Sequence, residues 1–216
     1  MEFAANNRPD LAAALFRLMG ATVPVQYSVE EEARELYSAL PNDQERLRKV
    51  IALCGEPKTP QQLYLAARAG SWLGGCDQQT AKYAQAYLET NGWSQLPAGS
   101  VVEEGITVNR QARHRAHMYA ILAQAQENLE KHETALTNYT EAYRLEPYEA
   151  MYAIKIADII AKCRSRKEAL RFLQQQKLTH YYRPVSYLDE HGNRSHNRTF
   201  QQVINSHILK LEAIEE

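Results

Sequence analysis

The spacing of apolar residues between positions 116 and 149 predicts two amphipathic helices joined by a short turn. Apolar residues return there every three or four positions, which places them on one face of an α-helix. Small residues stand where two such helices would cross, so close contact is allowed. The positions that carry the pattern are Leu122, Ala123, Ala135, Tyr139, Ala142 and Pro147.

The same pattern returns one period further along the chain. A step of about 34 residues pairs Leu122 with Ile156, Ala123 with Ala157, Ala135 with Ala169 and Tyr139 with Leu173. The match then fades, because Ala142 pairs with Gln176 and Pro147 with Tyr181. The second unit therefore looks like the last copy of a repeat array.

This arrangement resembles the tetratricopeptide repeat family, most clearly over residues 116–183. Gln126 departs from the family pattern, which usually has an aromatic residue there. The resemblance implies an all-α fold, a right-handed α-solenoid of antiparallel helix pairs that binds a partner. The alanines expected to be buried where helices cross are Ala123, Ala135, Ala142, Ala157 and Ala169.

Helix-start signals extend the predicted array over a single domain, residues 1–216. Most pair a capping side chain with an acid or amide three residues later, as in a capping box. The signals are Ser28 with Glu31, Asn42 with Glu45, Thr59 with Gln62, Ser165 with Glu168 and Thr199 with Gln202, together with the single caps Asp77 and Asn109. They predict about nine or ten helices.

The array is expected to fall into four parts. These are N-terminal helices at 1–58, a degenerate repeat at 59–92, two repeats at 109–183, and a hairpin with a capping helix at 184–216. In the degenerate repeat, Ala67 and Ala81 are the candidate small positions. The segment 92–108 has three Gly, one Pro and no helical period, so it is predicted to be a loop. Any strand is expected to lie within residues 186–195, where Gly192 can turn a hairpin.

Charge and cysteine content narrow the class of protein. The chain has 25 Lys and Arg against 26 Asp and Glu, a formal net charge of -1, so no bulk attraction to nucleic acid or anionic membrane is encoded. Glu2 and Asp10 stand where a secretory signal would be basic, which predicts a cytoplasmic protein. The three cysteines, Cys54, Cys76 and Cys163, are too far apart for a disulfide framework or a thiolate zinc site.

The sequence shows no local signature of metal binding or catalysis. His114 and His117 share a helix face, but Met118 and Ile121, four residues after each, cannot complete a zinc site. Phosphate-binding loops, nucleophile elbows and H-E-x-x-H motifs are absent from the sequence. We therefore expect no metal, no cofactor and no catalytic activity, although a catalytic site assembled from distant residues stays open.

The family resemblance implies which residues line the concave groove. Carried over by position, they are His117, Ala120, Gln124 and Asn128 in one unit and Met151, Ile154, Asp158 and Lys162 in the next. Chaperone-tail clamps of the family hold Lys and Asn at some of these positions, and this sequence does not reproduce them. A partly apolar peptide or helix is the expected partner. Gln124 and Asp158 are expected to be dispensable for folding, at no more than roughly 0.5 kcal/mol each on replacement by Ala.

A basic cluster begins the long helix predicted from residue 110. Its members are Arg110, Arg113, His114, Arg115 and His117. Arginine offers paired donors in a fixed fork, so Arg110 and Arg113 are candidate contacts for a phosphate or a peptide carboxylate. The plainer interpretation is a solvated helix face balanced by Glu103 and Glu104.

Two classes of function follow from these observations. The first is a protein-interaction scaffold or adaptor, alone or as the regulatory part of a larger system, and it is compatible with oligomerisation. The second is a nucleic-acid-associated protein that uses the basic and aromatic stretches at 110–117 and 180–198. The net charge favours the first.

Overall fold

The computed structural model describes residues 33–34, 43–95, 98–103, 106–177, 184–188 and 194–213. Within these ranges the α-helices are α4 (Gln44–Cys54), α5 (Pro60–Leu73), α6 (Asp77–Glu89), α7 (Arg110–Asn128), α8 (His132–Leu145), α9 (Ala150–Cys163), α10 (Arg166–Lys177) and α11 (Phe200–Glu212). A 3-10 helix spans Gly92–Gln95. The strands are β1 (Ser100–Glu103), β2 (Ile106–Asn109), β3 (Pro184–Leu188) and β4 (Arg194–Thr199).

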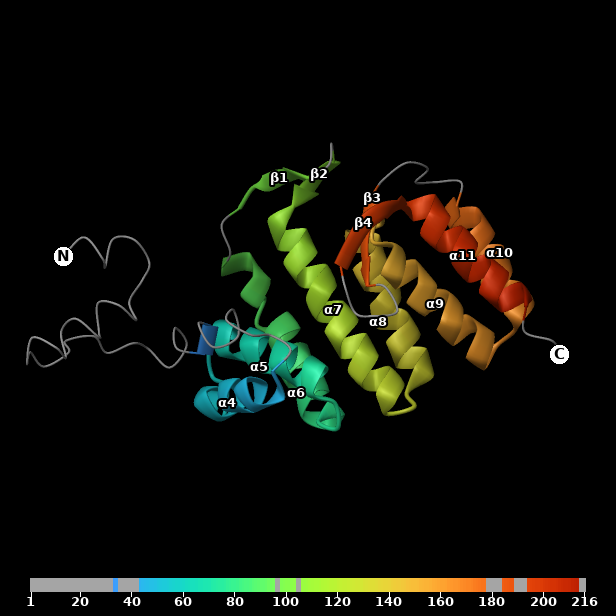
Figure 1. The fold of residues 1–216 in the computed structure, drawn as a ribbon. Helices are drawn as coiled ribbons and strands as arrows, with labels where there is room; N and C mark the ends of the chain where they lie inside the picture. The colour runs from blue at the N-terminus through green and yellow to red at the C-terminus, as the bar shows by residue number, and fades with distance from the viewer. Residues whose placement is uncertain are drawn as a thin grey trace, which may run out of the picture.

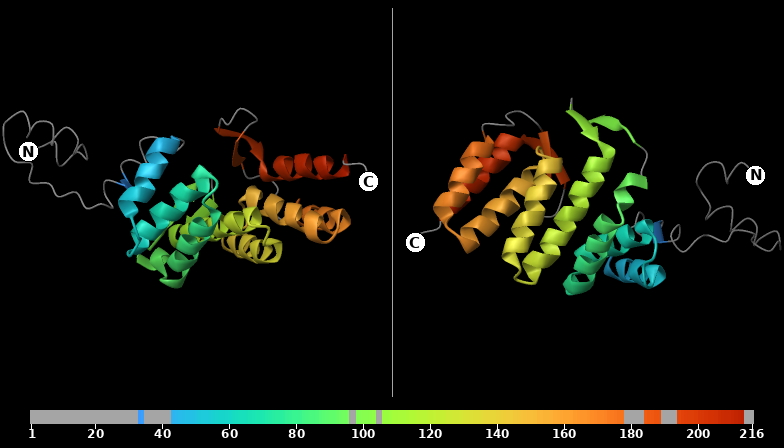
Figure 2. Two further views of the ribbon diagram at one scale, coloured as in Figure 1. Left: turned by 90° about the horizontal axis from the view of Figure 1, so that it is seen from below. Right: turned by 180° about the vertical axis from the view of Figure 1, so that it is seen from behind.

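Each helix packs against the next helix along the sequence. Figure 1 shows α4 to α6 at one end, α7 and α8 in the middle and α9 to α11 at the other end. In Figure 2, left, α4 and α11 lie on the same side of the row of helices between them. The described chain is therefore a sequentially packed helical array with two short hairpins, as the all-α prediction requires.

Alternate helices also touch, which defines a layer within the array. α5 contacts α7, and α9 contacts α11. Glu127 of α7 reaches Lys155 of α9 at 3.1 Å. We call α5, α7, α9 and α11 the first layer. Behind it, Tyr143 of α8 meets α10 through the ring of Phe172 and the amide oxygen of Gln176.

Several predicted helix starts are confirmed. Thr59 and Thr199 each form a full capping box, and Pro60 occupies the first turn of α5. The Asn109 side chain accepts a hydrogen bond from the Ala112 amide at 2.9 Å. The Ser165 hydroxyl accepts one from the Glu168 amide at 3.2 Å. These side chains satisfy amides that have no partner within the helix.

Two predicted caps are wrong by one residue. The cap of α4 is Asp43 rather than Asn42. The Asp43 side chain accepts hydrogen bonds from the backbone amides of Glu45 and Arg46. α6 starts with Cys76 as its cap, without a side-chain hydrogen bond, so Asp77 lies in the first turn instead. The Asp77 carboxylate accepts a hydrogen bond from Asn128 at 2.8 Å, a tertiary contact that a local capping rule does not contain. The signal at residues 28–31 lies outside the described residues.

The five alanines predicted at helix crossings are fully buried. Ala123, Ala135, Ala142, Ala157 and Ala169 all have 0% exposed surface. Their small side chains let neighbouring helix backbones approach closely, so larger residues packed around them can interlock. The repeat spacing read from the sequence therefore marks true packing positions.

The crossing of α5 and α6 uses a different pair from the one predicted. Ala67 is buried, but Ala81 is only partly buried. A methyl group added at Gly70 would overlap the hydroxyl of Thr80. Gly70 therefore allows α5 to approach α6 closely at Thr80. The spacing of Ala67 and Ala81 does not indicate this contact. Whether residues 59–92 are a true repeat stays a prediction.

The hairpins confirm one prediction and correct another. β3 and β4 form the antiparallel hairpin expected around residues 186–195, with Tyr187 opposite Ser195 and an irregularity between Val185 and Tyr187. The prediction that strands are confined to residues 186–195 is wrong, because β3 begins at Pro184 and β4 ends at Thr199. The strands β1 and β2 also pair, with Val101 opposite Val108. Pairing satisfies backbone groups that an irregular loop would leave to water.

The core is divided into three clusters that follow the order of the helices. One joins α4 to α7, one joins α7 to α9, and one joins α9 to α11. In the last, α11 contributes Phe200 and Ile204, both at 0% exposure, so it covers the apolar face that α9 and α10 would otherwise expose. Among the described residues, every helix is too short or too polar to span a bilayer. The cytoplasmic location stays a prediction.

Replacing Ala135 by Leu should overpack the crossing of α7 and α8. Ala135 is fully buried in one cluster with Ala123 and Ile159, so a larger side chain must displace its neighbours and the free energy of unfolding should fall by roughly 1 to 3 kcal/mol. Thermal unfolding followed by circular dichroism measures this. Ala52→Leu, at an exposed position of α4, is the matched control and should leave the melting temperature nearly unchanged. Equal melting temperatures for both variants and the natural chain would contradict the packing described above.

Candidate interaction surface

The residues predicted to line a groove lie on α7 and α9, which are neighbours in the first layer. Gln124, Asn128, Met151 and Lys162 are exposed, with 42% of the Met151 surface accessible. Four others are less accessible than predicted: His117, Ala120 and Asp158 are half-buried, and Ile154 is buried in the core between α9 and α11. Half of the predicted set therefore contributes to packing rather than to an open surface.

Glu127 joins α7 to α9 through two lysines. Its carboxylate accepts hydrogen bonds from Lys155 Nζ and Lys162 Nζ, both at 3.1 Å, and only 11% of its side chain is exposed. Burial alone would raise the pKa of this carboxyl, but the charges and hydrogen bonds of the two lysines outweigh it and hold the pKa below its ordinary value. Glu127 is therefore ionised at neutral pH and fixes the spacing of the two helices.

Two further contacts use predicted groove residues. The Asp158 carboxylate lies 2.7 Å from His207 Nε2 and so ties α9 to α11. Asn128 donates to Asp77 at 2.8 Å and so ties the end of α7 to the start of α6. Asp158 thus makes a contact that holds two helices of the protein together. Replacing Asp158 by Ala removes this contact, which the expectation of a neutral effect on folding did not include. Gln124 and Met151 keep their accessible side chains.

His117 and His114 pack against α5 rather than facing an open groove. Their rings lie 6.3 and 4.9 Å from the ring of Tyr64, between centroids. Burial is the main cause that lowers the pKa of His117, to about 4, and the charges of Arg68 and His114 lower it further. The pKa of His114 is also lowered, first by burial and then by Arg68 and Arg113. His117 is therefore uncharged at pH 7 and adds no positive charge to the cluster.

The arginines of the predicted basic cluster point to different partners. Arg113 Nε donates to Glu146 Oε1 at 2.9 Å, and the Glu146 side chain is only 7% exposed. The Arg115 guanidinium lies 5.1 Å from the ring of Trp93 and 5.6 Å from that of Tyr119. Arg110 is exposed. Arg113 and Arg115 therefore contact other parts of the protein. The predicted solvated helix face does not include these contacts.

Sequence reasoning missed the residues that fix the first layer. Glu127, Lys155 and His207 belong to neither the predicted groove nor the predicted basic cluster. A usable signal did exist, because Glu127 and Lys162 are opposite charges 35 residues apart, about one repeat period. Opposite charges one period apart on successive first helices can meet when the helices pack side by side. His207 gives no such signal, since its contact depends on how α11 docks.

In the part of the chain that the structure describes, no group of three or more His, Cys, Asp or Glu side chains could hold a metal ion. The chain matches no protein-family model, and it matches no curated protein. The fold defines the class only as a sequentially packed helical array, in which Gln124 of α7 and Met151 of α9 are exposed. We call the side of the array that carries these two residues the α7–α9 face. The tetratricopeptide resemblance stays a prediction.

Acid should destabilise the fold through His117. Its pKa is depressed in the folded state, so the unfolded chain binds the proton first, and the stability is complete above pH 6.5 and lost as the pH falls toward about 4. His117→Gln removes the titrating group and should shrink the difference in melting temperature between pH 7.5 and pH 5. Gln85→Ala, at an exposed position of α6 that does not titrate, is the control and should keep the natural difference. An unchanged difference for His117→Gln would mean that other groups set the acid response.

Proposed function

We propose that this chain is a protein-interaction scaffold that binds a peptide or helix along the α7–α9 face, without catalysis. The single observation that carries the proposal is that α7 and α9, joined by Glu127 and its two lysines, present accessible side chains of mixed character. Gln124 offers an amide and Met151 an exposed thioether. An adaptable apolar side chain beside hydrogen-bonding groups suits a partly apolar peptide.

The rigidity of the face supports this function. The ion pairs of Glu127 with Lys155 and Lys162 and the contact between Asp158 and His207 join three helices of the first layer. A surface that is already ordered loses little entropy when a ligand binds, so more of the contact energy appears as affinity. A solenoid of the tetratricopeptide type would use its first helices in this way.

The nucleic-acid alternative has weaker support. Arg113 and Arg115 are engaged with Glu146, Trp93 and Tyr119, and His117 is uncharged at neutral pH. The cluster at 110–117 therefore offers much less free charge than its composition suggests. The side chains of 180–198 lie outside what the structure describes, so that stretch stays a prediction.

Replacing Gln124 and Met151 together by Ala should weaken partner binding without unfolding the chain. Both side chains are exposed, so each replacement should change stability by no more than roughly 0.5 kcal/mol. If they contact the partner, the dissociation constant should rise about fivefold or more, equivalent to about 1 kcal/mol. The measurement is affinity capture from lysate with nuclease present, followed by titration of the captured protein.

The matched control for this experiment is Gln85→Ala with Thr137→Ala, which removes exposed side chains from α6 and α8 instead. It should capture the same protein with the natural affinity. Equal losses in both double variants would place binding elsewhere. Captured material that disappears entirely with nuclease would favour the nucleic-acid alternative.

A further inference from the structure

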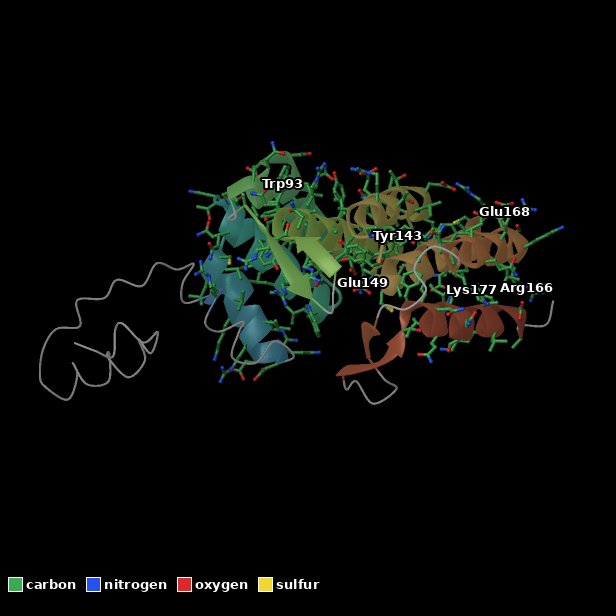
Figure 3. All side chains as sticks on the ribbon, turned by 90° about the horizontal axis from the view of Figure 1, so that it is seen from above. Trp93, Tyr143, Glu149, Arg166, Glu168 and Lys177 are labelled. Carbon is green, nitrogen blue, oxygen red and sulfur yellow. The ribbon has the colours of Figure 1, made fainter. Side chains whose placement is uncertain are left out.

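Positive charge is concentrated where α9 gives way to α10. Between residues 162 and 177 the basic residues are Lys162, Arg164, Arg166, Lys167, Arg171 and Lys177, and the single acidic residue is Glu168. The whole chain carries a formal charge of -1, so this segment differs in sign from the remainder. Figure 3 shows Arg166, Glu168 and Lys177 at the end of the array away from Trp93.

Two of these cations stand together on the outward side of α10. Lys167 and Arg171 are both exposed and one helical turn apart, so they project from the same face. The opposite side of the helix holds Ala169 and Leu173, both at 0% exposure in the core with α9 and α11. Neither Lys167 nor Arg171 forms an ion pair or hydrogen bond with another residue that the structure describes.

One polar neighbour extends the face that this pair forms. Gln174, one turn beyond Arg171, is exposed and can donate hydrogen bonds. Arg164, the C-cap of α9, keeps 48% of its side chain exposed and lies 3.6 Å from Glu133, a long contact between exposed groups that contributes little. We call Lys167, Arg171 and Gln174 the α10 face.

We propose that the α10 face is a second docking surface, separate from the α7–α9 face, and that it binds an acidic helical segment of a protein partner. Carboxylates one turn apart on such a helix have the same spacing as Lys167 and Arg171, so each could meet one cation. Gln174 would donate to a further side chain. Complementary charge of this kind speeds association and selects partners more than it adds affinity.

The charge beside the α10 face argues for a short acidic segment over a nucleic acid. α8 packs next to α10 through Tyr143, and its exposed side carries Glu133 and partly exposed Glu141. A nucleic acid carries about one charge per 1.7 Å of duplex and would extend across these carboxylates. A helix that follows α10 alone would avoid them.

The test uses the full chain and a fluorescent peptide of Glu and Ala, about 15 residues long because shorter helices are marginal. Fluorescence anisotropy at about 50 mM salt should show binding that fades as the salt rises and screens the charges. In Lys167→Gln with Arg171→Gln the dissociation constant should rise about threefold or more. The variant Lys167→Gln with Arg171→Lys keeps one of the two charges, so its dissociation constant for the peptide should rise less.

The matched control is Arg48→Gln with Lys82→Gln, which removes one exposed Arg and one exposed Lys from α4 and α6. It should bind the peptide as the natural chain does. An equal loss in the control, no binding at low salt, or tighter binding of single-stranded DNA than of the peptide would each overturn the proposal. The variants Gln124→Ala and Met151→Ala test a different layer of the array, so failure of one surface is distinguishable from failure of the other.

Discussion

Close contact between successive helices at small residues is the constraint on which this structure depends. Ala123 and Ala135 have no exposed surface where α7 meets α8, and Ala157 and Ala169 repeat this one pair later. An array has no central core to compensate for a poor contact, because each helix touches mainly its neighbours. The spacing at each crossing therefore decides where every later helix lies, including the helices that carry the candidate surface.

Polar side-chain contacts then fix the positions of the helices in the first layer. Glu127 links α7 to α9, and the pair of Asp158 and His207 links α9 to α11. Such partly exposed pairs stabilise the fold modestly, but they select one register of neighbouring helices. The same helices present Gln124 and Met151, so the contacts that order the layer also order the surface proposed to bind a partner.

Local rules predicted the parts of this fold that local interactions determine. The capping boxes at Thr59 and Thr199 involve residues three positions apart, and the buried alanines follow from one repeated spacing. The absence of a helical period in residues 92–108 predicts a loop but does not detect the β1–β2 hairpin, because paired strands such as Val101 opposite Val108 follow a period of two.

The candidate surface was predicted less well, for a physical reason. A position in the family's repeat predicts the direction in which a side chain points. It does not predict which residue of another helix that side chain contacts. Asp158 points toward α11 and is engaged by His207, while His117 packs against Tyr64 of α5. These contacts join residues far apart in the sequence, and only the packed array brings them together.

Photo-crosslinking from position 124 tests the central claim most directly. A photoreactive residue in place of Gln124 should form a covalent adduct with a protein in nuclease-treated lysate, because Gln124 is exposed on α7 and belongs to the surface proposed to bind a partner. The same residue at Thr137, on the exposed side of α8, should give little of that adduct. An adduct of equal yield from Thr137, or adducts with nucleic acid alone from position 124 in untreated lysate, would contradict the account.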